Sequence, residues 1–154
     1  MSENGARVAV VTGGVGGIGT AICRSLANDG YKVVATYHRQ MPQEELDAWT
    51  KERKDEGLDV GLAAGDVSSA EDSASMMAEI KEKFGAVSVL VNCAGITRDK
   101  TFKKMESEHW DAVIDTNLSS VFYITKHVWD DMLAAGFGRV INISSVNGQR
   151  GQFG

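Results

Sequence analysis

The sequence contains one proline and two cysteines, and it has no long uninterrupted run of apolar residues. A single proline beside 17 glycines argues against a disordered linker and for tight turns inside regular structure. Cys23 and Cys93 form no CxxC pair and no disulfide framework, so we expect reduced, buried thiols. No apolar run approaches the roughly 18 residues of a membrane span.

The residues after Met1 also lack the basic and apolar regions of a secretory signal, so we expect a cytoplasmic protein without a membrane partner. Basic residues are in the minority, with 16 Lys and Arg against 21 Asp and Glu, and the net charge of −5 argues against nucleic acid as a partner. His38, His109 and His127 show no metal-ligand spacing, and we expect no metal site.

Short apolar runs alternate with helical patterns along the chain. Continuous Val and Ile runs are typical of parallel strands covered on both faces. The pattern therefore predicts an α/β fold with a doubly wound parallel sheet, in a single domain spanning residues 1–154. We expect strands at 8–11, 32–36, 59–63, 87–91 and 139–143, and helices at 20–28, 43–56, from Ser68 or Ser69 to 84, and 107–135.

A glycine-rich turn lies directly between the first predicted strand and the first predicted helix. In this context the glycines allow a tight turn, a close approach to a pyrophosphate and close packing of helix on sheet. The helix N-terminus would present free N–H groups to the phosphates. A purely structural turn is the alternative interpretation. The candidate cofactor-binding residues here are Gly13, Gly14, Gly16, Gly17, Ile18 and Gly19.

The end of the second predicted strand reads Thr-Tyr-His-Arg at residues 36–39 and contains no acid. A site for NAD usually has Asp or Glu there, bound to the ribose 2′-hydroxyl. Arg39 is instead suited to a 2′-phosphate, because its planar guanidinium binds phosphate through two donors. The pattern therefore favours NADP over NAD, with a solvated surface arginine as the alternative for Arg39.

Further candidates follow the third and fourth predicted strands. Asp66, next to Val67, carries a carboxylate that would accept a hydrogen bond from an adenine amino group or cap a helix, and both interpretations stay open. Asn92, Ala94 and Gly95 follow a central strand, where small residues let a ligand lie against the backbone.

Two polar residues stand out later in the chain. Asn117 lies inside an apolar helical stretch, where its side chain would either bend the helix or hold a water molecule. Ser145 ends the fifth predicted strand, at an edge where its hydroxyl would reach a substrate carbonyl.

In this order and spacing, the glycine turn, the 92–95 segment, Asn117 and Ser145 resemble the short-chain dehydrogenase/reductase family. The resemblance covers all 154 residues and implies a Rossmann fold truncated after the fifth strand. Residues 95–99, 110–118 and 142–154 are most similar to the NADPH-dependent acetoacetyl-CoA reductases of bacterial polyhydroxybutyrate synthesis. The 3-oxoacyl-acyl-carrier-protein reductases of fatty-acid synthesis are close relatives of those enzymes.

The resemblance implies a role for each matching residue. Ser145 would hydrogen-bond the ketone oxygen, and Asn117 would hold a water in the proton relay. The glycine turn would bind the phosphates of NADPH, Asp66 and Val67 the adenine, and the 92–95 segment the ribose. The family usually has a second Asn where this chain has Cys93, and we interpret the change as tolerated because contacts there are made by the backbone.

The loop after Ser145 lies on the substrate side in the family. Gln152 and Phe153 there would suit an amide-rich pantetheine arm and an acyl chain. Lys104 would meet the acidic end of coenzyme A, or it would be one of several solvated lysines. The resemblance thus implies an acyl thioester as the small-molecule substrate.

The family's proton donor is a Tyr that follows the catalytic Ser, with a Lys one helical turn further on, and neither position falls within the 154 residues. Tyr31, Tyr37 and Tyr123 lie elsewhere in the chain. Because a positioned acid typically contributes ~10²–10⁴-fold to the rate, we expect the chain as given not to reduce ketones.

The sequence therefore predicts part of an NADP-dependent oxidoreductase that reduces acetoacetyl-CoA to 3-hydroxybutyryl-CoA. A reductase acting on a carrier-protein thioester and a non-catalytic nucleotide-binding module are the alternatives. The 107–135 region resembles the helices through which relatives form tetramers, so we expect a homo-oligomer.

Overall fold

The expected strands form one parallel sheet in the order β3-β2-β1-β4-β5. The computed structural model describes residues 5–153. The strands β2 and β3 are added on one side of β1, and β4 and β5 are then added on its other side. The strand order therefore reverses between β1 and β4. The doubly wound fold is confirmed. The strands are β1 Val8–Val11, β2 Lys32–Tyr37, β3 Val60–Ala64, β4 Val87–Asn92 and β5 Arg139–Asn142.

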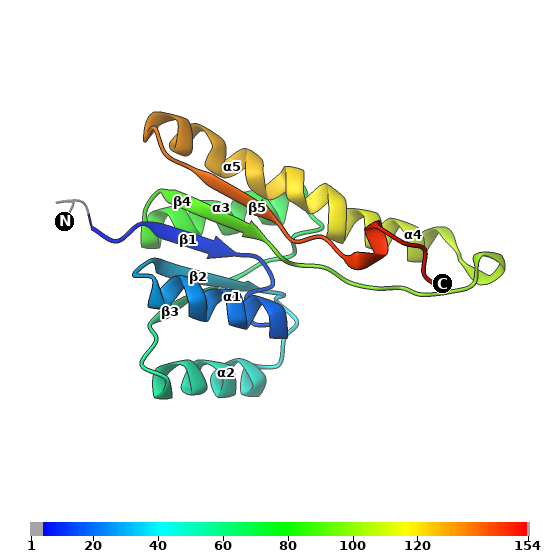
Figure 1. Ribbon diagram of the computed structural model, residues 1–154, viewed down its shortest axis with the longest axis horizontal. Helices are drawn as coiled ribbons and strands as arrows, with labels where there is room; N and C mark the ends of the chain where they lie inside the picture. Colours follow the sequence, from blue (N-terminus) through cyan, green and yellow to red (C-terminus); the bar gives the residue numbers. More distant parts are fainter. Residues whose placement is uncertain (1–4, 154) are drawn as a thin grey trace.

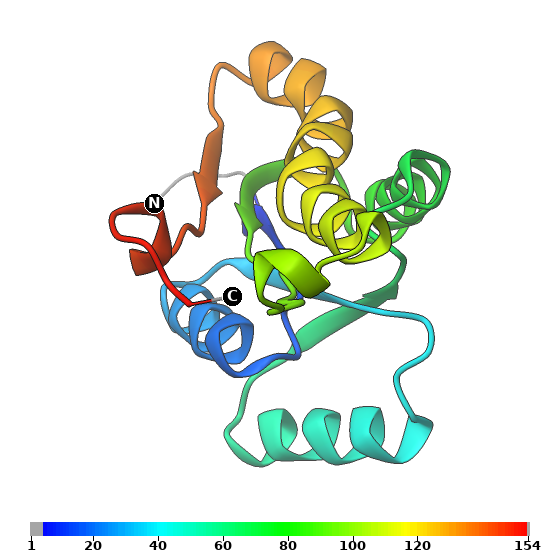
Figure 2. The same ribbon diagram turned by 90° about the vertical axis from the view of Figure 1, so that its right-hand side faces the viewer.

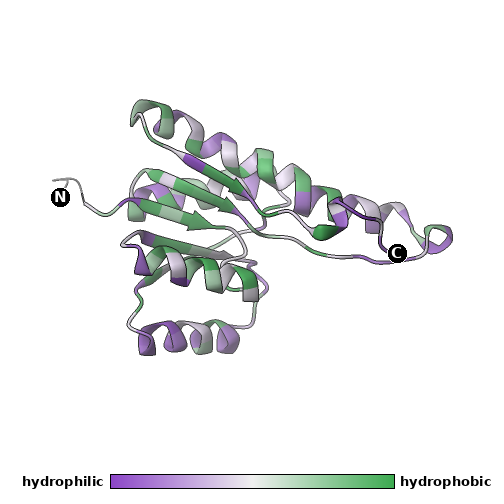
Figure 3. Cartoon of the chain, in the orientation of Figure 1, coloured by the Kyte–Doolittle hydropathy of each residue, from purple (hydrophilic) through white to green (hydrophobic). Residues whose placement is uncertain are grey.

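Helices cover both faces of this sheet (Figures 1 and 2). The helices α1 (Gly17–Asn28) and α2 (Gln43–Asp55) pack on one face, and α3 (Ala70–Phe84) and α5 (Ser120–Ala134) pack on the other. Successive strand side chains point to opposite faces. In β1, Val8 and Val10 therefore belong to the α3/α5 core, while Ala9 and Val11 belong to the α1/α2 core. The strands are accordingly apolar along most of their length (Figure 3).

The first helix begins at Gly17, three residues earlier than the apolar pattern predicts. Glycine disfavours a helix interior, so the sequence pattern becomes visible only after Gly19. The N-cap of α3 is Ser69, whose hydroxyl oxygen accepts a hydrogen bond from the Asp72 N–H at 3.2 Å.

The helical region predicted from 107 to 135 is confirmed, although it is not a regular α-helix along its whole length. It consists of α4 (Ser107–Ile114), a π-helical turn η2 (Asp115–Ser119) and α5. The run stays helical throughout, because a π-turn accommodates one extra residue without breaking it. Asn117 lies in the middle of it.

The strand β5 forms one edge of the sheet, and the segments after β4 and β5 extend beyond the carboxyl ends of the strands (Figure 1). Each segment contains one short 3₁₀ turn, η1 (Phe102–Lys104) in the first and η3 (Val146–Gly148) in the second. No helix among residues 5–153 has the length and apolar content needed to cross a lipid bilayer.

Candidate cofactor-binding site

Packing alone requires three of the turn's glycines. Gly13 has φ +62°, and a Cβ there would lie 3.0 Å from Ala94 Cα. A Cβ at Gly14 would lie 2.6 Å from the Ala35 Cβ, and one at Gly19 would overlap the Gly13 carbonyl oxygen. These glycines let β1, β2 and α1 meet at close range, as the structural interpretation of the turn expects.

Gly17 has a different environment. A Cβ at Gly17 would meet no atom within 4 Å, so the backbone here faces open space. The helix cap at Gly16 has no side-chain hydrogen bond, and no acidic residue lies in the first turn of α1. The first N–H groups of a helix have no intrahelical partner and carry the positive end of its dipole. The turn therefore has a backbone surface that suits an anionic group.

Thr12 ties this turn to the next strand of the sheet. Its hydroxyl oxygen accepts hydrogen bonds from the backbone N–H groups of Cys93 (2.9 Å) and Ala94 (3.0 Å). Thr36 likewise accepts from the Gly13 N–H at 3.3 Å. Neither role was predicted from the sequence, although Thr12 and Thr36 lie at the carboxyl ends of the neighbouring strands β1 and β2.

A groove runs along the carboxyl ends of the strands in two adjoining parts. The part over the glycine turn has a volume of about 380 Å³, and the part over the β3–α3 loop about 540 Å³. Tyr37 and His38 line both parts. The predicted residues that line the groove are Gly13, Gly16, Gly17, Ile18, Gly19, Asp66, Val67, Ala94 and Gly95.

Asp66 is held by the loop that follows β3. Its Oδ1 accepts hydrogen bonds from the Ser68 N–H (2.9 Å) and hydroxyl (2.6 Å), and these bonds lower the pKa of the carboxyl. Its Oδ2 lies 3.8 Å from His38 Nε2. Asp66 thus stabilises a turn just before the helix, whose cap is Ser69, and keeps an ionised oxygen at the groove.

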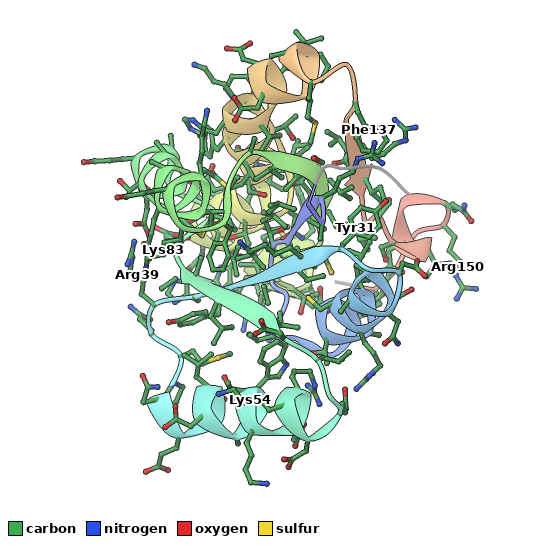
Figure 4. All side chains as sticks on the ribbon, turned by 90° about the vertical axis from the view of Figure 1, so that its left-hand side faces the viewer. Tyr31, Arg39, Lys54, Lys83, Phe137 and Arg150 are labelled. Carbon is green, nitrogen blue, oxygen red and sulfur yellow. The ribbon has the colours of Figure 1, made fainter. Side chains whose placement is uncertain are left out.

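Arg39 lies outside both parts of the groove. Figure 4 shows Arg39 at the outer edge of the molecule, below α3. Its guanidinium donates to both carboxylate oxygens of Asp72 in α3, with the shortest distance 2.7 Å from Nη2 to Oδ1. Asp72 Oδ2 also accepts from the Asp66 N–H at 2.6 Å. The arginine is the main cause of the lowered pKa of Asp72. Arg39 is therefore engaged in a network that supports the Asp66 loop.

Asn92 is buried, and its side chain also lies outside the groove. Its amide nitrogen donates to Asn142 Oδ1 (2.9 Å) and Thr125 Oγ1 (3.3 Å). These bonds link the end of β4 to the end of β5 and to the middle of α5. The side chain thus braces the strand ends beside the ribose region that the sequence predicts.

Asn117 reaches out of the π-turn to the loop that follows β4. Its Oδ1 accepts from the Ile96 N–H (2.8 Å), and its Nδ2 donates to the Ile96 carbonyl (2.9 Å). Both polar atoms of the amide are therefore used in fixing this loop. Its side chain bonds the loop and not its own helix, so the bend expected from a side chain folding back on its helix is not observed.

The remaining predicted residues do not gather around the groove. Ser145 caps η3, with its Oγ accepting from the Asn147 N–H at 3.2 Å. Lys104, Gln152 and Phe153 are exposed on the two segments beyond the strands, and Phe153 is 84% exposed. Within residues 5–153 no cluster of three or more His, Cys, Asp or Glu side chains is placed to hold a metal ion.

Residues 7–154 match the family model described as short chain dehydrogenase. The chain belongs to the short-chain dehydrogenase family. A curated relative in this family, the acetoacetyl-CoA reductase of Allochromatium vinosum, is 62% identical over 97% of this chain and 60% of its own length. The acetoacetyl-CoA reductase of Cupriavidus necator is 51% identical over 96% of this chain and 59% of its own.

The 3-oxoacyl-[acyl-carrier-protein] reductase of Staphylococcus aureus is 40% identical, over 95% of this chain and 58% of its own length. The chain thus spans about three fifths of the length of the curated relatives it matches.

Two solved structures of the family share the fold. An actinorhodin polyketide ketoreductase with NADPH superposes with a TM-score of 0.87 at 36% identity, covering 96% of this chain and 56% of that one. A gluconate 5-dehydrogenase from Burkholderia cenocepacia with NADP and tartrate gives 0.83 at 31% identity, covering 97% and 57%.

Proposed function

We propose that this chain forms the cofactor-binding part of an NADPH-dependent reductase whose substrate is acetoacetyl-CoA. The observation that carries the proposal is the groove at the strand-order reversal, where the uncapped start of α1 faces open space. Doubly wound sheets bind dinucleotides at this position. The residues present fit the cofactor, because Gly17 leaves room for a phosphate and no acid ends β2.

The proposed reaction converts a 3-ketone into a 3-hydroxyl group. NADPH, when bound, supplies the two electrons as a hydride. Ser145 hydrogen-bonds the ketone oxygen through its hydroxyl proton, since its Oγ already accepts from the Asn147 N–H. Asn117 acts as a positioning residue by fixing the loop after β4 through Ile96, where it also supports the water that the family resemblance implies.

The thioester substrate is proposed to lie over the exposed segments beyond β4 and β5. Gln152 offers an amide to the pantetheine arm, Phe153 an apolar ring to the acyl chain, and Lys104 a charge to coenzyme A. The 62% identity to an acetoacetyl-CoA reductase favours coenzyme A over a carrier protein, for which the comparable identity is 40%. Turnover compared on the two kinds of thioester separates these substrates.

We also propose self-association through the outer side of α4, η2 and α5, consistent with a homotetramer. Large apolar side chains are exposed there, and water-exposed apolar patches commonly mark interfaces. A double variant, Phe122→Lys with Leu133→Lys, is expected to lower the mass in sedimentation experiments; an unchanged mass contradicts this interface. The exposed residues are Trp110, Leu118, Phe122, Trp129 and Leu133.

The function is tested on a sample whose intact mass is 16.5 kDa. We expect saturable NADPH binding by calorimetry, and no binding would contradict the proposal. NADPH oxidation is then followed with acetoacetyl-CoA. Turnover would show that residues 1–154 suffice for reduction. Binding without turnover would assign cofactor binding to these residues and the proton donor to another part of a longer protein.

A further inference from the structure

NADPH differs from NADH only in its 2′-phosphate, so the residues that contact this group determine which cofactor is selected. The inference concerns those residues and rests on the proposed function. The end of β2 has no carboxylate for a ribose 2′-hydroxyl, while its one arginine, Arg39, is bound to Asp72 on the outside of the groove. A phosphate at the end of β2 would therefore meet a different side chain first.

His38 is that side chain. It lines the groove part over the glycine turn and also the part over the Asp66 loop, so it lies at their junction. Its side chain is 52% exposed, which leaves the ring accessible to a ligand. Of the other residues that line both parts, only Tyr37 has a polar side chain; Gly13, Ala94 and Gly95 contribute backbone.

The hydrogen bonds of His38 determine which nitrogen is a donor. Its Nδ1 accepts the Gln40 backbone N–H at 3.2 Å, so Nδ1 is unprotonated and the neutral ring carries its proton on Nε2. Nε2 lies 3.8 Å from Asp66 Oδ2, which is longer than a direct hydrogen bond. Nε2–H therefore makes no direct hydrogen bond here, and its nearest recorded acceptor is Asp66 Oδ2, so a ligand oxygen in the groove that His38 lines would compete with Asp66 for this donor.

We propose that His38 selects NADPH over NADH by donating its Nε2–H to the 2′-phosphate, and that Arg39 acts as a positioning residue through Asp72. A phosphate oxygen is a strong, charged acceptor, which a ribose hydroxyl is not.

The charges around this position are partly balanced, and the carboxylate oxygen left facing His38 is Asp66 Oδ2, 3.8 Å from Nε2. The negative charge of Asp72 is offset by Arg39, and one oxygen of Asp66 is satisfied by two donors from Ser68. The Asp66 N–H bond to Asp72 keeps the loop in register with His38. Losing Arg39 would loosen this loop and weaken both cofactors, whereas losing His38 would weaken only the phosphorylated one.

Calorimetric titration with NADP⁺ and NAD⁺ tests the proposal independently of turnover. His38→Leu is expected to raise the Kd for NADP⁺ about tenfold, the scale of a hydrogen bond to a charged group, and the Kd for NAD⁺ less than about twofold. His38→Gln, whose amide nitrogen reaches the Nε2 position, should restore most of the preference, and the shorter His38→Asn should not. The matched control, His127→Leu on the exposed side of α5, should leave both values unchanged.

Three results would overturn the proposal. An equal loss of both cofactors in His38→Leu would show a merely structural role. A loss of NADP⁺ preference in Arg39→Leu but not in His38→Leu would assign the phosphate to the arginine. Binding of neither cofactor by the unmodified chain would contradict the proposed function as well, which distinguishes that failure from the other two.

Discussion

The sheet has two regions that are similarly apolar in sequence but differ in how far their side chains are buried. In β1, β2 and β4 the apolar side chains are almost completely buried between helices on both faces. At the β5 margin, formed by β5 and the outer side of α5, apolar side chains face solvent, with Ile141 at 46% and Leu133 at 66% exposure. Local apolar pattern thus predicts a strand or helix but does not tell how much of it is covered.

The difference matters for function because the groove lies on the covered region. Its walls are fixed by bonds between strand ends, such as those that Thr12 makes to the backbone after β4. The exposed segment that follows β5 carries Ser145, Gln152 and Phe153, for which we propose contact with the substrate. Cofactor binding and substrate contact are therefore expected to respond differently to mutation.

The largest expected effect is on the free energy of unfolding, and it compares one substitution in each region. Leu90 in β4 is fully buried, so Leu90→Ala is expected to lower the free energy of unfolding by about 3 kcal/mol through lost burial and a cavity. Ile141→Ala, at the β5 margin, removes a side chain that is 46% exposed and should cost less than half as much. Urea denaturation measures both, and equal losses would refute the distinction.

The next effect concerns two glycines of one helix turn. Gly19→Ala should cost about 2 kcal/mol and weaken NADPH binding, because the added Cβ would overlap the Gly13 carbonyl oxygen. Gly17→Ala places its Cβ in open space and should be stable, losing affinity only through contact with the ligand. Thermal unfolding with and without NADPH distinguishes the two, and similar melting temperatures for both unliganded variants would contradict this assignment.

A smaller effect is expected at the link between β1 and β4. Thr12→Val keeps the shape but removes the acceptor for the Cys93 and Ala94 N–H groups, at a cost of about 1–2 kcal/mol. Thr12→Ser keeps the oxygen and serves as the control. Hydrogen exchange at the two amides should be faster in the valine variant alone; unchanged exchange would show that other acceptors suffice.

The smallest effect is electrostatic and lies at the surface, between α1 and α2. The Arg24 guanidinium, with help from Arg53, lowers the pKa of Glu56 from 4.5 to about 2. A carboxyl with a lowered folded pKa stabilises the protein above its unfolded pKa, and this contribution disappears as the pH falls from about 4.5 to about 2. Urea titrations across that pH range should show that the free energy of unfolding depends less on pH in Glu56→Gln than in the unmodified chain. An identical dependence would show that the Arg24–Glu56 ion pair does not contribute to stability.

Sequence patterns predicted the strands and their α/β order well, because a strand such as β1 is apolar at every position and flanked by turn residues. They did not predict the side-chain network around Arg39, since its partner Asp72 lies more than thirty residues away. Which side chain faces a groove depends on such long-range pairs. For the same reason Asn92 and Asn117 were recognised as candidates, but their partners were not.

The π-turn has a consequence for how tolerant this helix is to changes in length. Each residue of a helix rotates the chain by about 100°, so one inserted residue changes the phase of everything that follows. Here α4 and α5 keep separate phases, and α5 points Ile124, Val128 and Met132 to the core. Deleting one residue from 115–119 would restore a regular helix, yet it would turn either the Asn117 amide or the buried stripe of α5 away from its partners. The extra residue thus fixes the phase of α4 relative to α5, and the length of this turn is constrained from both sides: by the Asn117 contacts to the loop and by the core contacts of α5.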